Sequence, residues 1–94
     1  MPFVLIIHPV ADYAAWKIVF DQSATLRRHA GEVTYQVLKD ETDPNLVVHF
    51  SRWRSLAAAR DFLESPQMVK IRKQAGVKSS KILYLDQLES AALN

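Results

Sequence analysis

The sequence contains no cysteine, which excludes a disulfide framework and a zinc site built on thiolates. Its only two glycines, Gly31 and Gly76, cannot form a glycine-rich phosphate loop. No apolar run approaches the roughly 18 residues of a membrane-spanning helix. The net charge of only +2 is far from the basic excess of a nucleic-acid-binding domain. We therefore expect neither a membrane nor a nucleic acid among the partners.

The N-terminal stretch also lacks the marks of an exported protein. Residues 1–8 have neither the basic start nor the cleavage site of a signal peptide, and we expect a cytoplasmic location. Of the 94 residues, 49% are hydrophobic and 23% are charged, which is typical of a folded globular protein. This length suits one domain, which we expect to span residues 1–94.

Short apolar runs and breaker residues divide the chain into six main elements. In order, we expect a strand at 3–8, a helix from 12 to about 30, strands at 32–39 and 46–53, a helix at 55–64 continued by a piece from 66 to about 76, and a strand at 81–85. The tail, 86–94, suggests a short helical turn or a docked arm. The order β-α-β-β-α-β predicts an α+β, ferredoxin-like fold with a four-stranded antiparallel sheet and the first and third strands at its centre.

Helix caps support these limits. Asp12 and Ser55 stand where N-cap residues are expected, and Gly31 stands where a left-handed residue ends a helix. In the first helix, Trp16, Phe20 and Leu26 fall on one face at helical spacing, so we expect this face to pack on the sheet.

The strands predict something about assembly. Two helices cover only one face of a four-stranded sheet, so the other face should be polar if water covers it. Instead, apolar residues occupy both alternating sets of the first, third and fourth strands, as Leu5 and Ile6 illustrate. We therefore expect a homodimer that packs two sheets face to face. The alternative is a monomer whose short tail covers the sheet.

Three stretches of the sequence carry a resemblance to a known family. They are His8-Pro9-Val10-Ala11-Asp12-Tyr13-Ala14-Ala15-Trp16-Lys17 with Phe20-Asp21, Arg52-Trp53-Arg54-Ser55, and Phe62-Leu63-Glu64-Ser65-Pro66 followed by Ala75-Gly76-Val77. Over residues 3–87 the chain resembles the dimeric α+β barrel proteins of the antibiotic biosynthesis monooxygenase-like group. The resemblance implies a dimeric barrel and, in each subunit, a pocket between the sheet and the helices.

The same resemblance bears on chemistry, although the superfamily holds cofactor-free oxygenases, haem-degrading enzymes, isomerases and members without known activity. The haem-degrading branch has a tryptophan where this chain has Phe62, and a haem-binding histidine near Arg72. Because neither residue is present, we do not expect haem degradation. We expect no cofactor.

His8 is the candidate catalytic residue. It ends the first strand before a proline-containing loop, and a histidine with an ordinary pKa near 6.5 can act as a base at neutral pH. In a cofactor-free oxygenase this base would remove a phenolic or activated C–H proton, and the resulting anion would pass an electron to O₂. The alternative is a structural histidine that hydrogen-bonds the loop or helix.

The other histidines have different expectations. If Leu46, Val48 and Phe50 pack on the helices, His49 faces the dimer barrel, and so would His8; we therefore expect His49 at the interface. His29 fits a cation at a helix end. The histidine spacings match no metal motif, and we expect no metal.

Four aromatic residues, Tyr13, Trp16, Phe20 and Phe62, are candidates for lining a pocket that binds a flat apolar ligand. The alternative is ordinary core packing. Trp53 is a candidate for covering that pocket, or for packing at the start of the second helix. Arg27 is a candidate for binding a ligand phenolate or carboxylate, or for forming an ion pair. The segment from Ser65 to Lys81 is basic, which is typical of a solvated helix face; the alternative is that it attracts an anionic ligand.

Two functions remain open from the sequence. One is a small cofactor-independent monooxygenase-like protein that acts on an apolar aromatic or polyketide-like compound. The other is a non-catalytic small-molecule-binding or stress-related homodimer with structural histidines. A cavity of a few hundred Å³ would favour the enzyme, and a site filled by its own side chains would weaken it.

Overall fold

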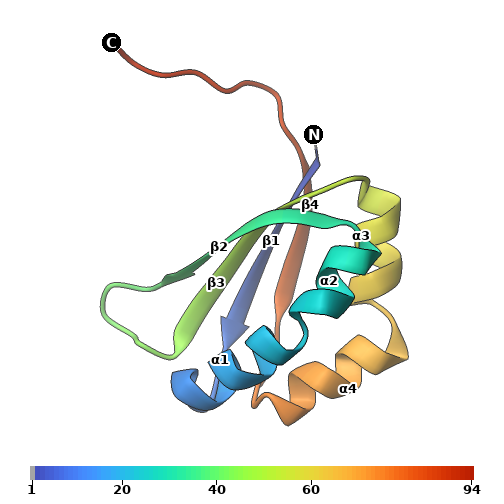
Figure 1. Cartoon of the computed structure of the whole chain (residues 1–94). Helices are drawn as coiled ribbons and strands as arrows, with labels where there is room; N and C mark the ends of the chain where they lie inside the picture. Colours follow the sequence, from blue (N-terminus) through green and yellow to red (C-terminus); the bar gives the residue numbers. More distant parts are fainter. Residues whose placement is uncertain (1) are drawn as a thin grey trace.

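The computed structural model describes residues 2–94 (Figure 1). Its elements are β1 (Pro2–Pro9), α1 (Tyr13–Gln22), α2 (Ala24–Ala30), β2 (Glu32–Lys39), β3 (Leu46–Trp53), α3 (Leu56–Leu63), α4 (Pro66–Gln74) and β4 (Lys81–Asp86). None of the helices formed by these residues combines the length and the apolar character that crossing a bilayer requires.

The four strands form one antiparallel sheet in the order β2-β3-β1-β4. The first and third strands are central, and all helices lie on one side of the sheet (Figure 1). The predicted ferredoxin-like α+β fold is confirmed. The predicted strand limits agree with the structure to within one residue at each end.

The predicted caps are present at the helix ends. The Asp12 side chain accepts a hydrogen bond from the Ala15 amide at 2.9 Å, and Ser55 Oγ accepts one from the Ala58 amide at 3.0 Å. Gly31 follows α2 with a φ of 124°, a backbone conformation that side chains with a Cβ rarely adopt. Local sequence signals therefore determine where these helices begin and end.

The single helix predicted from 12 to about 30 is wrong, because the chain breaks at Ser23 into α1 and α2. Ser23 Oγ donates a hydrogen bond to the Phe20 carbonyl at 2.9 Å, as short polar side chains do when they compete with helical bonding. The break changes the packed face, so Arg27 is only 3% exposed whereas Leu26 is 40% exposed. A buried salt bridge of Arg27, described below, accounts for this exchange.

The tail also differs from both of its predicted forms. Residues 87–94 have no regular secondary structure, and Figure 1 shows them leading away from the sheet. Leu88 and Leu93 are fully exposed.

Alternation along the central strands assigns each side chain to a face. Val4, Ile6 and His8 of β1 and Val47 and His49 of β3 are buried beneath the helices. The prediction that His49 lies on the dimer side of the sheet is therefore wrong. That prediction assumed that the purely apolar alternating residues of β3, Leu46, Val48 and Phe50, pack on the helices. The alternating residues that include His49 are buried there instead, because ion pairing accommodates the histidine in the core.

The opposite face of the sheet is not covered within residues 2–94 (Figure 1). Phe3 of β1 stacks on Phe50 of β3 with 5.2 Å between the ring centroids. Half-buried apolar side chains continue this surface across the sheet: Leu5, Ile7, Leu46 and Val48. We call this surface the open face.

The cap at α3 provides a test of the local reasoning. Replacing Ser55 by Ala removes the acceptor for the Ala58 amide, so we expect a loss of about 1 kcal/mol in the free energy of unfolding. Ser55→Asp should retain most of the stability, because a carboxylate also caps the helix. Urea unfolding measures both variants, and equal losses in the two would contradict the capping role.

Candidate functional site

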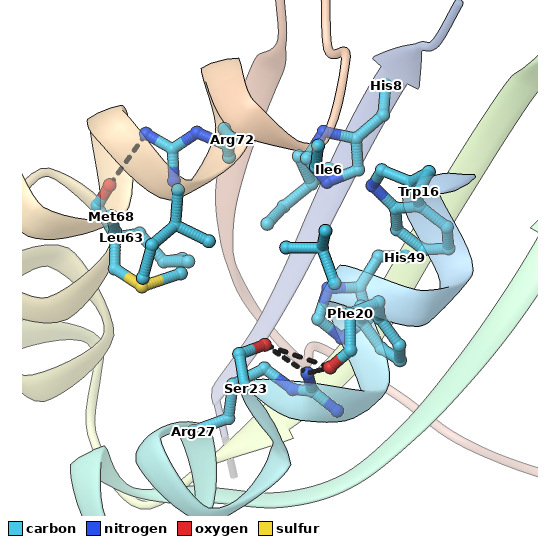
Figure 2. A pocket seen from close by; sticks show the side chains of 13 residues that line it. Ile6, His8, Trp16, Phe20, Ser23, Arg27, His49, Leu63, Met68 and Arg72 are labelled. Atoms are coloured by element: carbon cyan, nitrogen blue, oxygen red, sulfur yellow. Dashed lines mark hydrogen bonds between the residues drawn. The ribbon is translucent and has the colours of Figure 1, made fainter. Parts of the chain in front are cut away.

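A small cavity lies between the helix-covered face of the sheet and two groups of helices, α1/α2 and α3/α4 (Figure 2). Its volume is about 40 Å³. The lining residues are Ile6, His8, Trp16, Val19, Phe20, Ser23, Arg27, His49, Leu63, Met68, Ile71, Arg72 and Ala75. Most of these side chains are apolar, and the polar ones carry the chemistry of the site.

His8 projects from β1 into this cavity beside Trp16, with 5.7 Å between the ring centroids. Its Nδ1 is buried and has no hydrogen-bond partner among residues 2–94. Burial, together with the charges of His49 and Arg72, lowers the pKa of His8 to about 3. His8 is therefore neutral at pH 7, with a nitrogen available to accept a proton or a hydrogen bond.

His49 and Arg27 lie on either side of a buried carboxylate at the start of β2. Arg27 Nε donates to Glu32 Oε1 at 2.7 Å, and His49 Nε2 lies 2.8 Å from Glu32 Oε2. Burial alone would raise the pKa of Glu32, but the His49 and Arg27 hydrogen bonds and charges outweigh it and lower that pKa. Glu32 thus remains ionised and connects α2, β2 and β3.

Arg27 also holds the wall of the cavity. Its Nη1 donates to Ser23 Oγ at 2.8 Å and to the Phe20 carbonyl, both at the break between α1 and α2 (Figure 2). Its guanidinium carbon lies 3.7 Å from the centroid of the Phe20 ring, a cation–π arrangement. Phe20 in turn stacks on Trp16 at 4.7 Å, so one salt bridge positions the aromatic wall.

Arg72 enters the cavity from α4 on the opposite side (Figure 2). Its Nη2 donates to the Leu63 carbonyl at 2.8 Å, whereas its buried Nη1 has no partner among residues 2–94. Burial lowers the pKa of Arg72 from its ordinary value, yet arginine stays protonated at neutral pH. From the sequence, Arg72 was recognised only within a basic segment and as the residue near the haem-binding histidine of the haem-degrading branch, because nothing local predicts its place in the cavity.

The structure brings together four of the residues predicted from the sequence: His8, Trp16, Phe20 and Arg27. Three others lie outside the lining. Tyr13 is 38% exposed and contacts Trp16 from the outside, at 6.0 Å between the ring centroids. Trp53 and Phe62 pack in a separate part of the core, where Trp53 Nε1 donates to Ser51 Oγ at 2.8 Å.

Two further parts of the site were not predicted from the sequence: Glu32 and the role of His49. The signal for Glu32 was its place just beyond the helix that carries Arg27. His29 is exposed at the end of α2, away from the cavity. Among residues 2–94, no group of three histidine or acidic side chains is arranged to hold a metal ion.

The size of the cavity limits what enters it. A volume of about 40 Å³ holds two or three water molecules, whereas drug-sized ligands occupy sites of roughly 300 Å³ or more. A flat aromatic ligand therefore requires the wall to move. Met68 lines the α4 side with a long unbranched side chain, which changes rotamer more readily than the packed rings opposite.

The lowered pKa of His8 predicts an effect on stability. Unfolded His8, with a pKa near 6.5, takes up a proton in mild acid, whereas folded His8 does not until about pH 3. Protonation therefore favours the unfolded state, and His8 should remove about 1.5 kcal/mol of stability between pH 6.5 and pH 5. Urea unfolding at the two pH values should show this fall in the wild type and in His29→Gln, but a smaller fall in His8→Gln. An identical fall in His8→Gln would contradict the burial of a neutral His8.

Comparison with known proteins identifies the family. The structure resembles Rv0793 from Mycobacterium tuberculosis (23% identity, TM-score 0.69, covering 98% of this chain and 100% of that one). It also resembles SnoaB, a cofactor-independent oxygenase from Streptomyces nogalater (20% identity, TM-score 0.73, covering 95% and 93%). No curated protein matches the sequence. The family model for antibiotic biosynthesis monooxygenase matches residues 14–74, more than half of the chain, and the chain therefore belongs to the antibiotic biosynthesis monooxygenase family.

Proposed function

We propose that the protein is a cofactor-independent oxygenase that converts an activated CH₂ group of a small aromatic or polyketide-like compound into a carbonyl. The observation that carries this proposal is the buried His8, whose neutral ring lines an apolar cavity and whose Nδ1 has no hydrogen-bond partner among residues 2–94. Membership of the family supports it, as does the likeness to a cofactor-independent oxygenase.

The chemistry needs a base, O₂ and a site without bulk water. His8 Nδ1 takes a proton from the CH₂ group, which leaves a carbanion stabilised as its enolate. This anion gives one electron to O₂, and the resulting radical and superoxide combine to a peroxide. The peroxide takes a proton from the His8 imidazolium, and loss of water then forms the carbonyl. The balance is CH₂ + O₂ → C=O + H₂O.

The resting pKa of His8, about 3, makes it available as a base but a weak one. The positive charges of His49 and Arg72 contribute to this low value. An anion formed beside the imidazolium attracts it and raises its pKa, so basicity increases as the proton moves. The wall of Trp16 and Phe20 excludes water, which strengthens this attraction.

The small size of the cavity favours a second candidate, a non-catalytic small-molecule-binding homodimer with structural histidines. A volume of about 40 Å³ admits no aromatic ring without movement of the α4 side chains. In this case His8 is a neutral core residue, and its substitution changes stability without changing any reaction.

Oxygen uptake with anthrone distinguishes the two candidates, because anthrone carries an activated CH₂ group and yields anthraquinone. We expect turnover above the uncatalysed rate, and a loss of about 10²- to 10⁴-fold in His8→Gln, as for removal of a general base. His29→Gln, which changes an exposed histidine, should keep the wild-type rate. Equal rates in His8→Gln and the wild type would remove His8 from the mechanism, and no turnover of activated CH₂ compounds would favour binding alone.

The open face supports a second element of the proposal, a homodimer that packs two sheets against each other. Its stacked pair Phe3–Phe50 and the apolar residues around it form the kind of contiguous patch that soluble proteins cover with a partner. Leu5 lies at its centre, paired in register with Phe50 and Leu83.

An aspartate at the open face tests this assembly. Leu5→Asp places a charge where the partner sheet would exclude water, so we expect sedimentation equilibrium to show a monomer. Leu93→Asp, in the fully exposed tail, should leave the dimer intact. A wild-type monomer, or a Leu5→Asp dimer of unchanged affinity, would contradict this interface.

A further inference from the structure

The cavity contains two arginines in different electrostatic situations. Arg27 is neutralised by the Glu32 carboxylate at 2.7 Å. Arg72 has no carboxylate within salt-bridge distance among residues 2–94, and no aspartate or glutamate lines the cavity. The site therefore keeps one uncompensated positive charge next to an apolar wall.

The Arg72 guanidinium is held in place for a ligand. The hydrogen bond from Nη2 to the Leu63 carbonyl leaves Nη1 as a buried donor without a partner among the described residues. A buried donor without an acceptor costs free energy, and a charged one costs more. An oxyanion of a ligand removes this cost by supplying both the acceptor and the negative charge.

His8 provides the second point of contact. Its Nδ1 is a buried acceptor, again without a partner within residues 2–94, and the charge of Arg72 reaches it strongly enough to lower its pKa. The two groups thus bind different partners: Arg72 binds an oxyanion, and His8 accepts a hydrogen bond or a proton from a hydroxyl or acidic C–H. A ligand that carries both satisfies the whole site.

We propose that Arg72 is an anion subsite, and that the preferred substrates are small aromatic acids whose carboxylate binds Arg72 while a neighbouring hydroxyl or acidic C–H faces His8. A neutral CH₂ compound such as anthrone uses the His8 step alone and leaves the subsite empty. This inference names the substrate class and rests on the proposed function. The cavity of about 40 Å³ has room for the three heavy atoms of a carboxylate, whereas the ring requires Met68 to move aside.

The proposal also accounts for the weak resting basicity of His8. Arg72 is one of the charges that disfavour the His8 imidazolium. Burial is the main cause of the low pKa of His8, and Arg72 adds a smaller contribution. A bound carboxylate neutralises Arg72 and removes that contribution, so the pKa of His8 should rise when an acid substrate binds. The reacting proton is thus taken in the complex, and His8 stays neutral in the empty site. His49 and Glu32, which form a pair of their own, remain unchanged by this binding.

Titration calorimetry with 2-hydroxybenzoate and its neutral isostere 2-hydroxybenzamide tests the subsite. We expect the acid to bind at least about tenfold more tightly than the amide, as a charge-assisted hydrogen bond predicts. Arg72→Gln should reduce this preference to within about twofold. Lys73→Gln, an exposed neighbour on α4, should keep it. Arg72→Lys, which retains the charge but not the fork of donors, should keep part of it.

Three results would overturn the proposal: equal affinity for the two compounds, no binding of the acid, or a preference that survives in Arg72→Gln. The wild-type comparison decides even if Arg72→Gln fails to fold. NMR of the His8 ring adds a second readout, because its pKa should rise with the acid bound and stay low with the amide. Titrations under argon measure binding in the absence of turnover. A preference for the acid, combined with no oxygen uptake in the separate assay, would contradict only the proposed oxygenase function. Oxygen uptake without a preference for the acid would contradict only the subsite.

Discussion

The Glu32 carboxylate is the constraint on which the arrangement of the site depends. It is buried at the start of β2, and nitrogens of Arg27 and His49, from two other elements, lie within 2.8 Å of its oxygens. Such a cluster is not a large source of net stability, because desolvation offsets most of the attraction. It instead provides specificity: if either partner moved, a buried charge would be left without compensation. The registry of α2 against β2 and β3 follows from that requirement.

The position of the aromatic wall follows from the same cluster. Arg27 pairs with Glu32 from within α2, and its Nη1 satisfies the Phe20 carbonyl and Ser23 Oγ at the break in the helix. The guanidinium also covers the Phe20 ring, against which Trp16 stacks. The break in the helix, the buried arginine and the shape of the cavity are thus consequences of one ion pair. The two sides of the cavity differ for this reason: one is held rigidly, and the other includes the flexible side chain of Met68 on α4.

Local signals predicted the elements but not the face that each strand buries. Asp12, Ser55 and Gly31 act on neighbouring backbone groups, so a few residues of sequence are enough to predict where each helix begins or ends. The face of β3 depends on whether His49 finds a partner in the core, and Glu32 stands 17 positions before it in the chain. Because both alternating sets of the central strands contain apolar residues, hydrophobicity alone could not decide between them. The position of Arg72 in the cavity could not be predicted for the same reason, because it depends on the packing of α4 and not on the neighbours of Arg72 in sequence.

The residue at position 72 also determines what kind of chemistry this side of the cavity permits. The haem-degrading branch of the superfamily, whose tryptophan and histidine this chain lacks, has its haem-binding histidine near this position. A guanidinium has no lone pair to offer a metal, and it remains protonated at any pH at which the protein folds. It therefore attracts an oxyanion where a histidine would attract a cation. An arginine at this position is therefore unsuited to holding a metal, and its charge favours pairing with an oxyanion. The aromatic wall and the neutral His8 opposite serve a flat organic ligand, because they supply apolar surface and a proton acceptor without a competing carboxylate.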